Sequence, residues 1–335
     1  MPRALVDIDK VQLLIGTVSS GISIPIVSSV TAPAGVMQMS CCSSSTRLTQ
    51  MAEAGETKGL WFRTFATADV QASVAAMLAR DAGIESISVL YKNDDWGQDI
   101  GRMAADAFAQ AGVKVIDQIA ITDGQPSYRA EATQALRGQP AALYLALYPT
   151  EGISFVREWL GLGGTPVMIG ANSLKSDDFR SAVGLENLGE FTGTDTASPR
   201  VASAESFVEA YTAHFGNAPS GPGLPNSFDA AAIALLAYHA AGKDASGAEI
   251  AAQVARVTDP AGEKIAADAA GFAKAMEVLS GGGTVSYQGA TGAVTFDANG
   301  DVSAPAVSWS FAADGVTEER YFTLEEIAGF MSGGN

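Results

Sequence analysis

The sequence predicts an α/β protein in which mainly parallel β-sheets are flanked by helices. Short runs rich in valine, isoleucine and leucine alternate with alanine-rich amphipathic segments over roughly the first 200 residues, a pattern typical of βαβ units. The chain has 335 residues, of which 47% are hydrophobic. That length and composition are enough for one large domain or two ordinary domains with well-filled cores.

The individual elements follow from the apolar runs and from the residues that cap helices. Strands are expected at residues 11–15, 36–39, 86–91, 113–120, 141–147, 166–169 and 191–196. Helices are expected at residues 69–82, 97–111, 127–137 and 151–161. Asp69 is a good N-cap for the first of these helices, and Gly83, Gly112 and Gly138 are suitable residues for helix ends.

The pattern changes after about residue 200, where helices dominate. Helices are expected at residues 203–215, 226–241, 247–256 and 266–280. An antiparallel region is expected to follow, with one strand in Thr291–Phe296 and another in Ala306–Phe311. Asp297–Asp301 lies between them and has the composition of a hairpin turn.

The charge balance argues against partners that need a basic surface. The chain has 37 acidic and 20 basic residues, a formal net charge of −17, which disfavours nucleic acid and anionic lipid. No apolar run approaches the length of about 20 residues that spans a membrane, so no direct membrane insertion is expected. Residues 1–10 lack the apolar region and cleavage site of a signal peptide.

Cys41 and Cys42 are the two cysteines of the chain. Because adjacent cysteines rarely bridge one another, no disulfide is expected, and the pair is interpreted as two small buried residues beneath a loop. His214 and His239 have no neighbouring ligand pattern, and no nucleophile, phosphate-loop or zinc motif is present. The sequence therefore predicts neither a cofactor, nor a metal site, nor an enzyme.

Two hydroxyl-rich loops follow the first two expected strands. Gly16–Gly21 comes directly after residues 11–15, and Ser40–Thr46 comes after residues 36–39. Ligands of parallel sheets bind at the carboxyl ends of strands, where free N–H groups and hydroxyls can hold a carboxylate without a charged side chain. We expect a binding site there for a small anionic or zwitterionic molecule.

Several motifs occur in an order and spacing that extend over nearly the whole chain, from Leu5 to its end. They are Val11–Ser20, Ser40–Thr49, Trp61–Thr64, Val89–Gly97, Tyr144–Gly152, Met168–Asn172 and Tyr287–Gly300. In these motifs the chain resembles the periplasmic solute-binding proteins of branched-chain amino-acid ABC transporters, the leucine/isoleucine/valine-binding type.

This resemblance implies a two-lobed type I periplasmic binding protein fold that closes on its ligand at a hinge. It places lobe 1 at residues 1–64 plus 198–308 and lobe 2 at residues 65–197 plus 309–335. Family members carry strands and helices before the position of Leu5, and at about 30 residues per unit roughly 60 residues and the export signal are missing. The first strands of lobe 1 are then absent, and its sheet has an unpaired apolar edge. A misplaced start codon or a truncated gene is the expected cause.

The resemblance also implies the ligand-binding residues. Ser20 corresponds to a serine that holds the ligand's carboxylate, and its neighbour Ser19 either binds ligand or caps the following helix. The other implied residues are the loop residues Cys42, Ser43 and Ser44, the aromatic wall residues Trp96 and Tyr148, and Asn172. Asn172 replaces a carboxylate that pairs with the ligand's ammonium in amino-acid binders, which favours a related carboxylate or an amide-type solute. Gly223 replaces an aromatic wall and leaves room for a larger side group.

The implied function is capture of a small-molecule solute for an ABC permease, with a periplasmic location. A sensor of the same fold that reports ligand occupancy to a regulatory partner is the alternative. The identity of the solute does not follow from the sequence.

Overall fold

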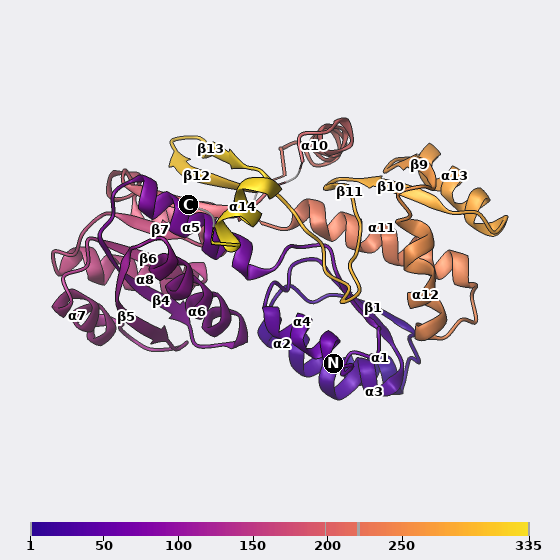
Figure 1. The fold of residues 1–335 in the computed structure, drawn as a ribbon, viewed down its shortest axis with the longest axis horizontal. Helices are drawn as coiled ribbons and strands as arrows, with labels where there is room; N and C mark the ends of the chain where they lie inside the picture. The colour runs from indigo at the N-terminus through magenta and orange to yellow at the C-terminus, as the bar shows by residue number, and fades with distance from the viewer. Residues whose placement is uncertain (1, 198, 220–221, 334–335) are drawn as a thin grey trace. The chain divides into compact units, whose positions relative to one another are not determined.

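The computed structural model describes residues 2–197, 199–219 and 222–333, which divide into two units (Figure 1). Unit 1 comprises Met1–Thr67 and Ser198–Ala304, and unit 2 comprises Ala68–Ala197 and Pro305–Asn335. The chain therefore passes between the units at residues 67/68, 197/198 and 304/305. Each unit has its own hydrophobic core.

Unit 2 is a parallel sheet with an antiparallel extension. Its strand order is β13-β12-β8-β7-β6-β4-β5, and the pairs from β8 to β5 are parallel. The strands are β4 (Ser86–Lys92), β5 (Lys114–Ile121), β6 (Ala142–Ala146), β7 (Met168–Gly170), β8 (Phe191–Thr196), β12 (Ala306–Ala312) and β13 (Gly315–Phe322). Every residue of β6 is buried, as expected for a central strand that is covered on both faces.

The helices of unit 2 pack in two groups, α5 with α6 and α14, and α7 with α8 and α9 (Figure 1). They are α5 (Ala68–Asp81), α6 (Asp95–Gln110), α7 (Arg129–Arg137), α8 (Pro149–Gly161), α9 (Asp177–Val183) and α14 (Leu324–Met331). Two short 3-10 helices, η2 (Asn172–Leu174) and η3 (Leu185–Asn187), complete this unit. Aromatic side chains such as Phe155, Trp159 and Phe191 fill its core.

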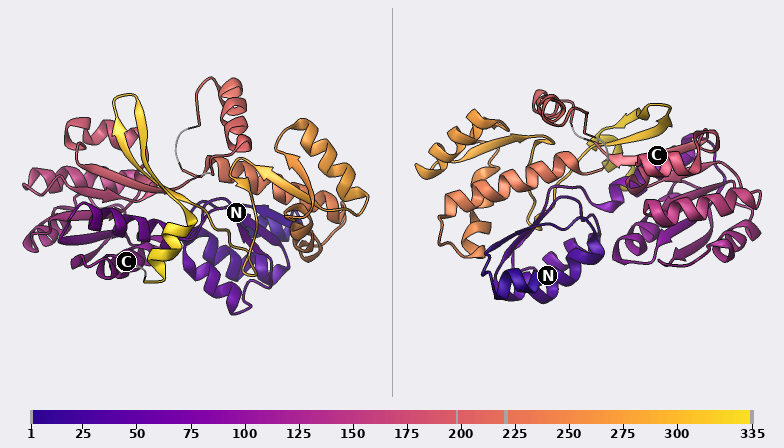
Figure 2. Two further views of the ribbon diagram at one scale, coloured as in Figure 1. Left: turned by 45° about the horizontal axis from the view of Figure 1, so that its top comes forward. Right: turned by 180° about the vertical axis from the view of Figure 1, so that it is seen from behind.

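Unit 1 contains two small sheets. The parallel sheet β1-β2-β3 is formed by Leu13–Ile15, Met37–Ser40 and Trp61–Arg63. It lies between α11 (Leu224–Ala241) on one side and the helical segment Ser20–Ala34 (α2, η1 and α3) with α4 (Thr46–Glu53) on the other (Figure 2). Among the described residues β1 has β2 as its one neighbouring strand, and Ile15 is exposed at its end.

The second sheet of unit 1 has the order β11-β10-β9 and joins Gly292–Ala293, Val285–Gly289 and Glu263–Ala266. The remaining helices of the unit are α1 (Pro2–Asp7), α10 (Ala202–Phe215), α12 (Gly247–Val257) and α13 (Ala269–Ser280). The last helix begins three residues later than expected from the sequence, because residues 263–266 form a strand and Asp268 caps the helix.

The hairpin expected around Asp297–Asp301 is wrong, although the turn itself forms. β11 ends at Ala293 and β12 begins at Ala306 in the sheet of unit 2, so no strand pair flanks the turn. Asp297 instead accepts hydrogen bonds from the N–H groups of Asn299 and Asp301, at 2.8 and 2.9 Å. The Gly300 carbonyl accepts from the Arg63 N–H at 2.9 Å. The turn therefore packs against β3.

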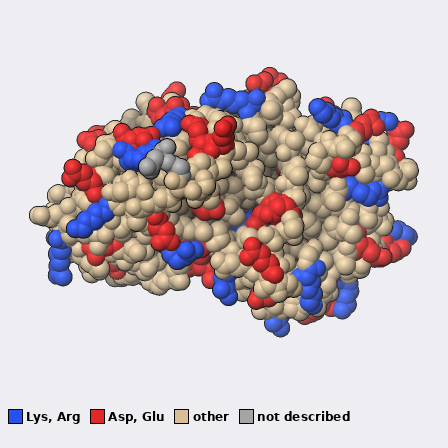
Figure 3. Space-filling view, viewed as in Figure 1, with Lys and Arg blue, Asp and Glu red and all other residues tan. Residues whose placement is uncertain are grey.

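No helix in the described ranges is long and apolar enough to cross a membrane. On the face drawn in Figure 3, acidic and basic side chains are interspersed, and the described residues form no continuous patch of either sign there.

Asp229 on α11 organises the β10–β11 hairpin. Its buried carboxylate accepts from the Tyr287 hydroxyl (2.8 Å), the Ala290 N–H (2.8 Å), and the N–H and hydroxyl of Thr291 (2.7 and 2.6 Å). We predict that Asp229→Asn lowers the free energy of unfolding by about 1–3 kcal/mol, because the amide's NH₂ group faces donors that are left unpaired. Urea unfolding measures the loss.

Asp244→Asn is the matched control, because this side chain is 89% exposed. We expect it to stay within about 0.5 kcal/mol of the wild type. Equal unfolding midpoints for the two variants would contradict the structural role given to Asp229.

Candidate functional site

The two hydroxyl-rich loops of unit 1 are held side by side. They follow β1 and β2, which are adjacent parallel strands, so both lie at the carboxyl edge of the same sheet. The Ser40 hydroxyl donates to the Thr17 carbonyl at 2.6 Å and accepts from the N–H groups of Cys42 and Ser43, at 3.2 and 3.1 Å. This serine therefore fixes the start of the second loop against the first.

Ser43 and Ser20 also connect the two loops. The buried Ser43 hydroxyl lies 3.1 Å from the Thr17 carbonyl and 2.8 Å from the Ser23 hydroxyl. The Ser20 hydroxyl accepts from the Ser45 N–H at 3.1 Å. Ser43 and Ser20, two of the predicted ligand residues, thus have hydrogen-bond partners within the protein. Ser23, which was not predicted, is one of these partners.

Ser44 differs from its neighbours. Within the described part of the chain, neither its N–H nor its hydroxyl has a hydrogen-bond partner, although the residue is 2% exposed. Ser19 is the N-cap of α2 with extended backbone, but its side chain makes no capping hydrogen bond. Of the loop serines, Ser44 therefore has the groups that are available to a ligand.

The expectation that the two cysteines do not bridge is wrong, because Cys41 and Cys42 form a disulfide. The chain bends at both residues after β2. Consecutive side chains point to opposite sides only in an extended strand, and this bend brings the two sulfurs together. The general rarity of such bridges gave no information on this local geometry.

Gly223 lies close to the sulfur of Cys42. A Cβ atom at this position would lie 2.5 Å from Cys42 Sγ. The glycine has a φ of +76° and precedes the first residue of α11. The disulfide therefore occupies the space into which a side chain at position 223 would project.

Arg63, at the end of β3, is fully buried and binds the backbone of the second loop. Its guanidinium donates to the carbonyls of Ser43 and Ser45 at 2.9 and 2.7 Å, and to the Thr49 hydroxyl at 2.6 Å. It pairs with the Asp301 carboxylate at 2.7 Å. Thr49 in turn donates to the second oxygen of Asp301 at 2.6 Å. Arg63 was not among the residues predicted from the sequence, although an arginine within the apolar segment Trp61–Thr64 was an available signal.

The predicted site residues of unit 2 come from three neighbouring strands. Trp96, Tyr148 and Asn172 follow β4, β6 and β7, which are adjacent in the sheet. The rings of Trp96 and Tyr148 are stacked, with centroids 5.0 Å apart and an interplanar angle of 25°. Asp94 caps α6 by accepting from the Gly97 N–H at 2.8 Å, which fixes the helical turn that carries Trp96.

Asn172 lies in a buried polar cluster that the sequence did not reveal. Its N–H donates to Gln71 Oε1 at 3.0 Å. The carboxylate of Asp195 interacts with the Asn172 side chain and pairs with Lys175 at 3.2 Å. Burial raises the pKa of Asp195, and the Lys175 ammonium opposes that shift. The neutral amide of Asn172 is therefore next to a carboxyl group that is itself paired with Lys175.

Two buried polar atoms in this cluster have no partner among the described residues, Gln71 Nε2 and Asp195 Oδ1. One is a donor and the other an acceptor. Together with Asn172 they give unit 2 a capacity for additional hydrogen bonds at the carboxyl ends of its strands.

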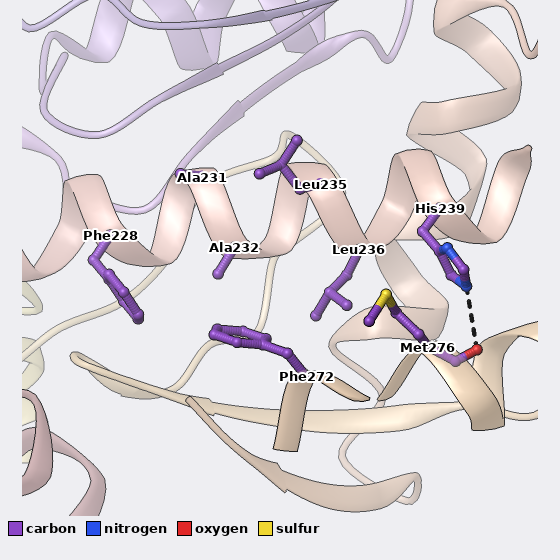
Figure 4. Close-up of a pocket in the computed structure, with 8 residues that line it drawn as sticks. All are labelled: Phe228, Ala231, Ala232, Leu235, Leu236, His239, Phe272 and Met276. Carbon is purple, nitrogen blue, oxygen red and sulfur yellow. Dashed lines mark hydrogen bonds between the residues drawn. The ribbon is translucent and has the colours of Figure 1, made fainter. Parts of the chain in front are cut away.

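An apolar pocket of about 300 Å³ lies elsewhere in unit 1, between α11 and α13 (Figure 4). Its lining includes Phe228, Leu236, Phe272 and Met276, and His239 at its end contacts the Met276 carbonyl at 3.2 Å. None of the predicted site residues lines it. The described residues contain no group of three or more potential metal ligands.

Comparison with known proteins agrees with this architecture. A family model described as periplasmic binding protein matches residues 3–300. The chain is 25% identical over 292 residues to the chemotactic signal transduction system substrate-binding protein BasB of Halobacterium salinarum, covering 85% of this chain and 66% of that protein. The chain therefore spans slightly less than two thirds of the length of this relative.

Solved structures also match. The leucine-binding protein LivK of Thermotoga maritima has a TM-score of 0.78 and 19% identity, over 97% of this chain and 83% of that chain. A solute-binding protein of an ABC transporter from R. palustris, in complex with benzoate, has a TM-score of 0.72 and 14% identity, over 96% and 80%. These matches confirm the predicted mainly parallel α/β fold of the type I periplasmic binding proteins.

The Arg63 interactions yield a stability prediction. Arg63→Met leaves the Asp301 carboxylate buried without its ion pair, so we expect the free energy of unfolding to fall by about 3–5 kcal/mol. Arg63→Lys keeps the positive charge but lacks the planar set of guanidinium donors. We expect it to lower the free energy of unfolding by less than Arg63→Met does. Urea unfolding distinguishes the two.

Arg102→Met serves as the control, since Arg102 is 55% exposed and pairs with Asp99 on the surface of α6. Surface pairs contribute about 0–1 kcal/mol. If Arg63→Met were no more destabilising than this control, Arg63 would not support the loop as described.

Proposed function

The chain belongs to the periplasmic binding protein family, and from this premise we propose that it is the extracytoplasmic solute-binding component of an ABC importer. Its solute is a small amino acid or a related carboxylate or amide. The fold supports a ligand-binding role, and the proteins it matches are solute-binding proteins rather than enzymes. The partner in this proposal is an ABC permease.

The proposal rests mainly on the hydrogen-bonding groups of Ser44. Its N–H and hydroxyl lack partners in the described part of the chain, while the residues on both sides of it are fixed by Ser40, Ser20 and Arg63. The loop leads directly into the N-terminus of α4 at Thr46. Preorganised N–H groups at a helix start favour an anion. We therefore assign the solute's carboxylate to Ser44.

Unit 2 offers complementary chemistry. The stacked rings of Trp96 and Tyr148 supply an apolar wall, and the side-chain oxygen of Asn172 suits a hydrogen-bond donor such as an ammonium or amide. In this proposal both units contact the same solute and close on it by a hinge motion. LivK is named as a leucine-binding protein, and the R. palustris protein holds benzoate. Both solutes carry a carboxylate.

A sensor role is the second candidate, because BasB is named as a substrate-binding protein of a chemotactic signal transduction system. The two functions share the same solute chemistry and differ in the partner. Copurification of the solute-loaded protein with an ABC permease supports import, and copurification with a chemotaxis transducer supports sensing.

The assignment of Ser44 is tested with Ser44→Ala. Isothermal titration of the wild type with L-leucine, L-isoleucine, benzoate and a set of aliphatic amides identifies the solute. We expect the variant to bind that solute about tenfold more weakly, because one hydrogen bond to a charged group is lost. Its unfolding midpoint should stay unchanged, because the Ser44 hydroxyl has no partner within the described protein.

Ser29→Ala is the matched control, since this serine is exposed on η1. It should bind as the wild type does. Equal affinity of Ser44→Ala and Ser29→Ala would remove Ser44 from the site, and the absence of binding by any tested carboxylate or amide would contradict the proposed solute class.

A further inference from the structure

The Cys41–Cys42 disulfide lies within the loop that carries Ser44. Cys41 directly follows the last residue of β2, and the Cys42 N–H donates to the Ser40 hydroxyl at 3.2 Å. Ser44 is two residues further along. Any change in the geometry of the cysteine pair is therefore transmitted over two peptide units to the group assigned to the solute.

The disulfide is packed against the backbone before α11. Cys42 Sγ lies 3.9 Å from the Gly223 carbonyl oxygen, and it is the atom that a side chain at position 223 would strike first. On the other side of the loop, Arg63 holds the Ser43 carbonyl at 2.9 Å. The sulfur pair thus sits between two fixed groups.

The two cysteines differ in their exposure to solvent. Cys41 is buried, at 7% exposure, whereas Cys42 is partly exposed. Thiol–disulfide exchange requires a thiolate to reach a disulfide sulfur, and access decides which sulfur is attacked. Attack at Cys42 gives a mixed disulfide and releases the Cys41 thiolate, which takes up a proton.

We propose that the Cys41–Cys42 disulfide is a redox switch that sets the conformation of loop 41–45 and, through Ser44, the affinity for solute. A dithiol supplies two electrons and two protons and is itself oxidised to a disulfide, leaving two cysteine thiols in the protein. The effect on affinity rests on the proposed function, whereas the effect on the loop does not.

Reduction disturbs the loop for a steric reason. Two sulfurs that are no longer bonded must separate to van der Waals contact. Movement of Cys42 towards Gly223 is limited, because its sulfur already lies 3.9 Å from the Gly223 carbonyl oxygen. The displacement therefore falls largely on the loop, where the Cys42 and Ser43 N–H groups donate to the Ser40 hydroxyl at 3.2 and 3.1 Å.

The first measurement needs no solute. The purified full chain is compared with and without dithiothreitol, its thiols are counted by alkylation and mass spectrometry, and amide hydrogen exchange is followed in loop 41–45. We expect no free thiol before reduction and two afterwards, with exchange at Cys42 and Ser43 about tenfold faster in the reduced protein. Two free thiols in the untreated protein, or identical exchange in both forms, would overturn the switch.

The second measurement is titration of both forms with L-leucine and benzoate. We expect the reduced form to bind at least about tenfold more weakly. Equal affinity in both forms would overturn the link to solute binding. A third outcome is that reduction changes hydrogen exchange in the loop but neither form binds L-leucine or benzoate. This outcome would overturn the link between the disulfide and binding of these two probes, and it would count against the proposed function. The redox effect on the loop would stand.

The double variant Cys41→Ser/Cys42→Ser shows whether the effects come from loss of the disulfide or from another action of dithiothreitol. It should resemble the reduced wild type in both exchange and affinity, and dithiothreitol should not change it. If dithiothreitol altered the variant as much as the wild type, the effect would come from elsewhere in the protein and the proposal would be wrong.

Discussion

The buried ion pair between Arg63 and Asp301 is the interaction on which unit 1 depends. Removing an arginine and a carboxylate from water costs several kcal/mol each, and only close pairing with further hydrogen bonds offsets that cost. Here the guanidinium is paired at 2.7 Å and also donates to Ser43, Ser45 and Thr49. The pair joins β3, the loop that carries Ser43 and Ser45, α4 and the turn at residues 297–301. Segments far apart in sequence are thereby fixed around the loop that presents Ser44.

Much of the fold was predictable because it follows local patterns. Strand β6 was expected at residues 141–147 from its continuous apolar run and occurs at Ala142–Ala146, with every residue buried. The turn at residues 297–301 was identified from its composition, but composition does not tell which segments it joins. Its partner is β3, more than two hundred residues earlier in the chain. Strand β13 (Gly315–Phe322) carries mostly half-exposed or exposed residues, so it lacks the buried apolar run that would predict a strand.

The candidate site was predictable in its location and less so in its chemistry. Parallel topology places residues after β1 and β2 at one sheet edge, and residues after β4, β6 and β7 at another, as the structure shows. Sequence cannot show which hydroxyls are already paired. Ser43 and Ser44 are identical neighbours, yet one bonds internally and the other has free groups in the described structure. Asp195 was not recognised because its relation to Asn172 arises only from strand pairing.

The proposed function requires one solute to perturb both Ser44 and Trp96. The most direct test is an NMR titration of the ¹⁵N-labelled protein with the solute that binds most tightly, following the Ser44 amide and the Trp96 indole N–H. We expect both resonances to shift with one common dissociation constant. Shifts with different constants, or a bound solute that leaves either resonance unmoved, would contradict that expectation.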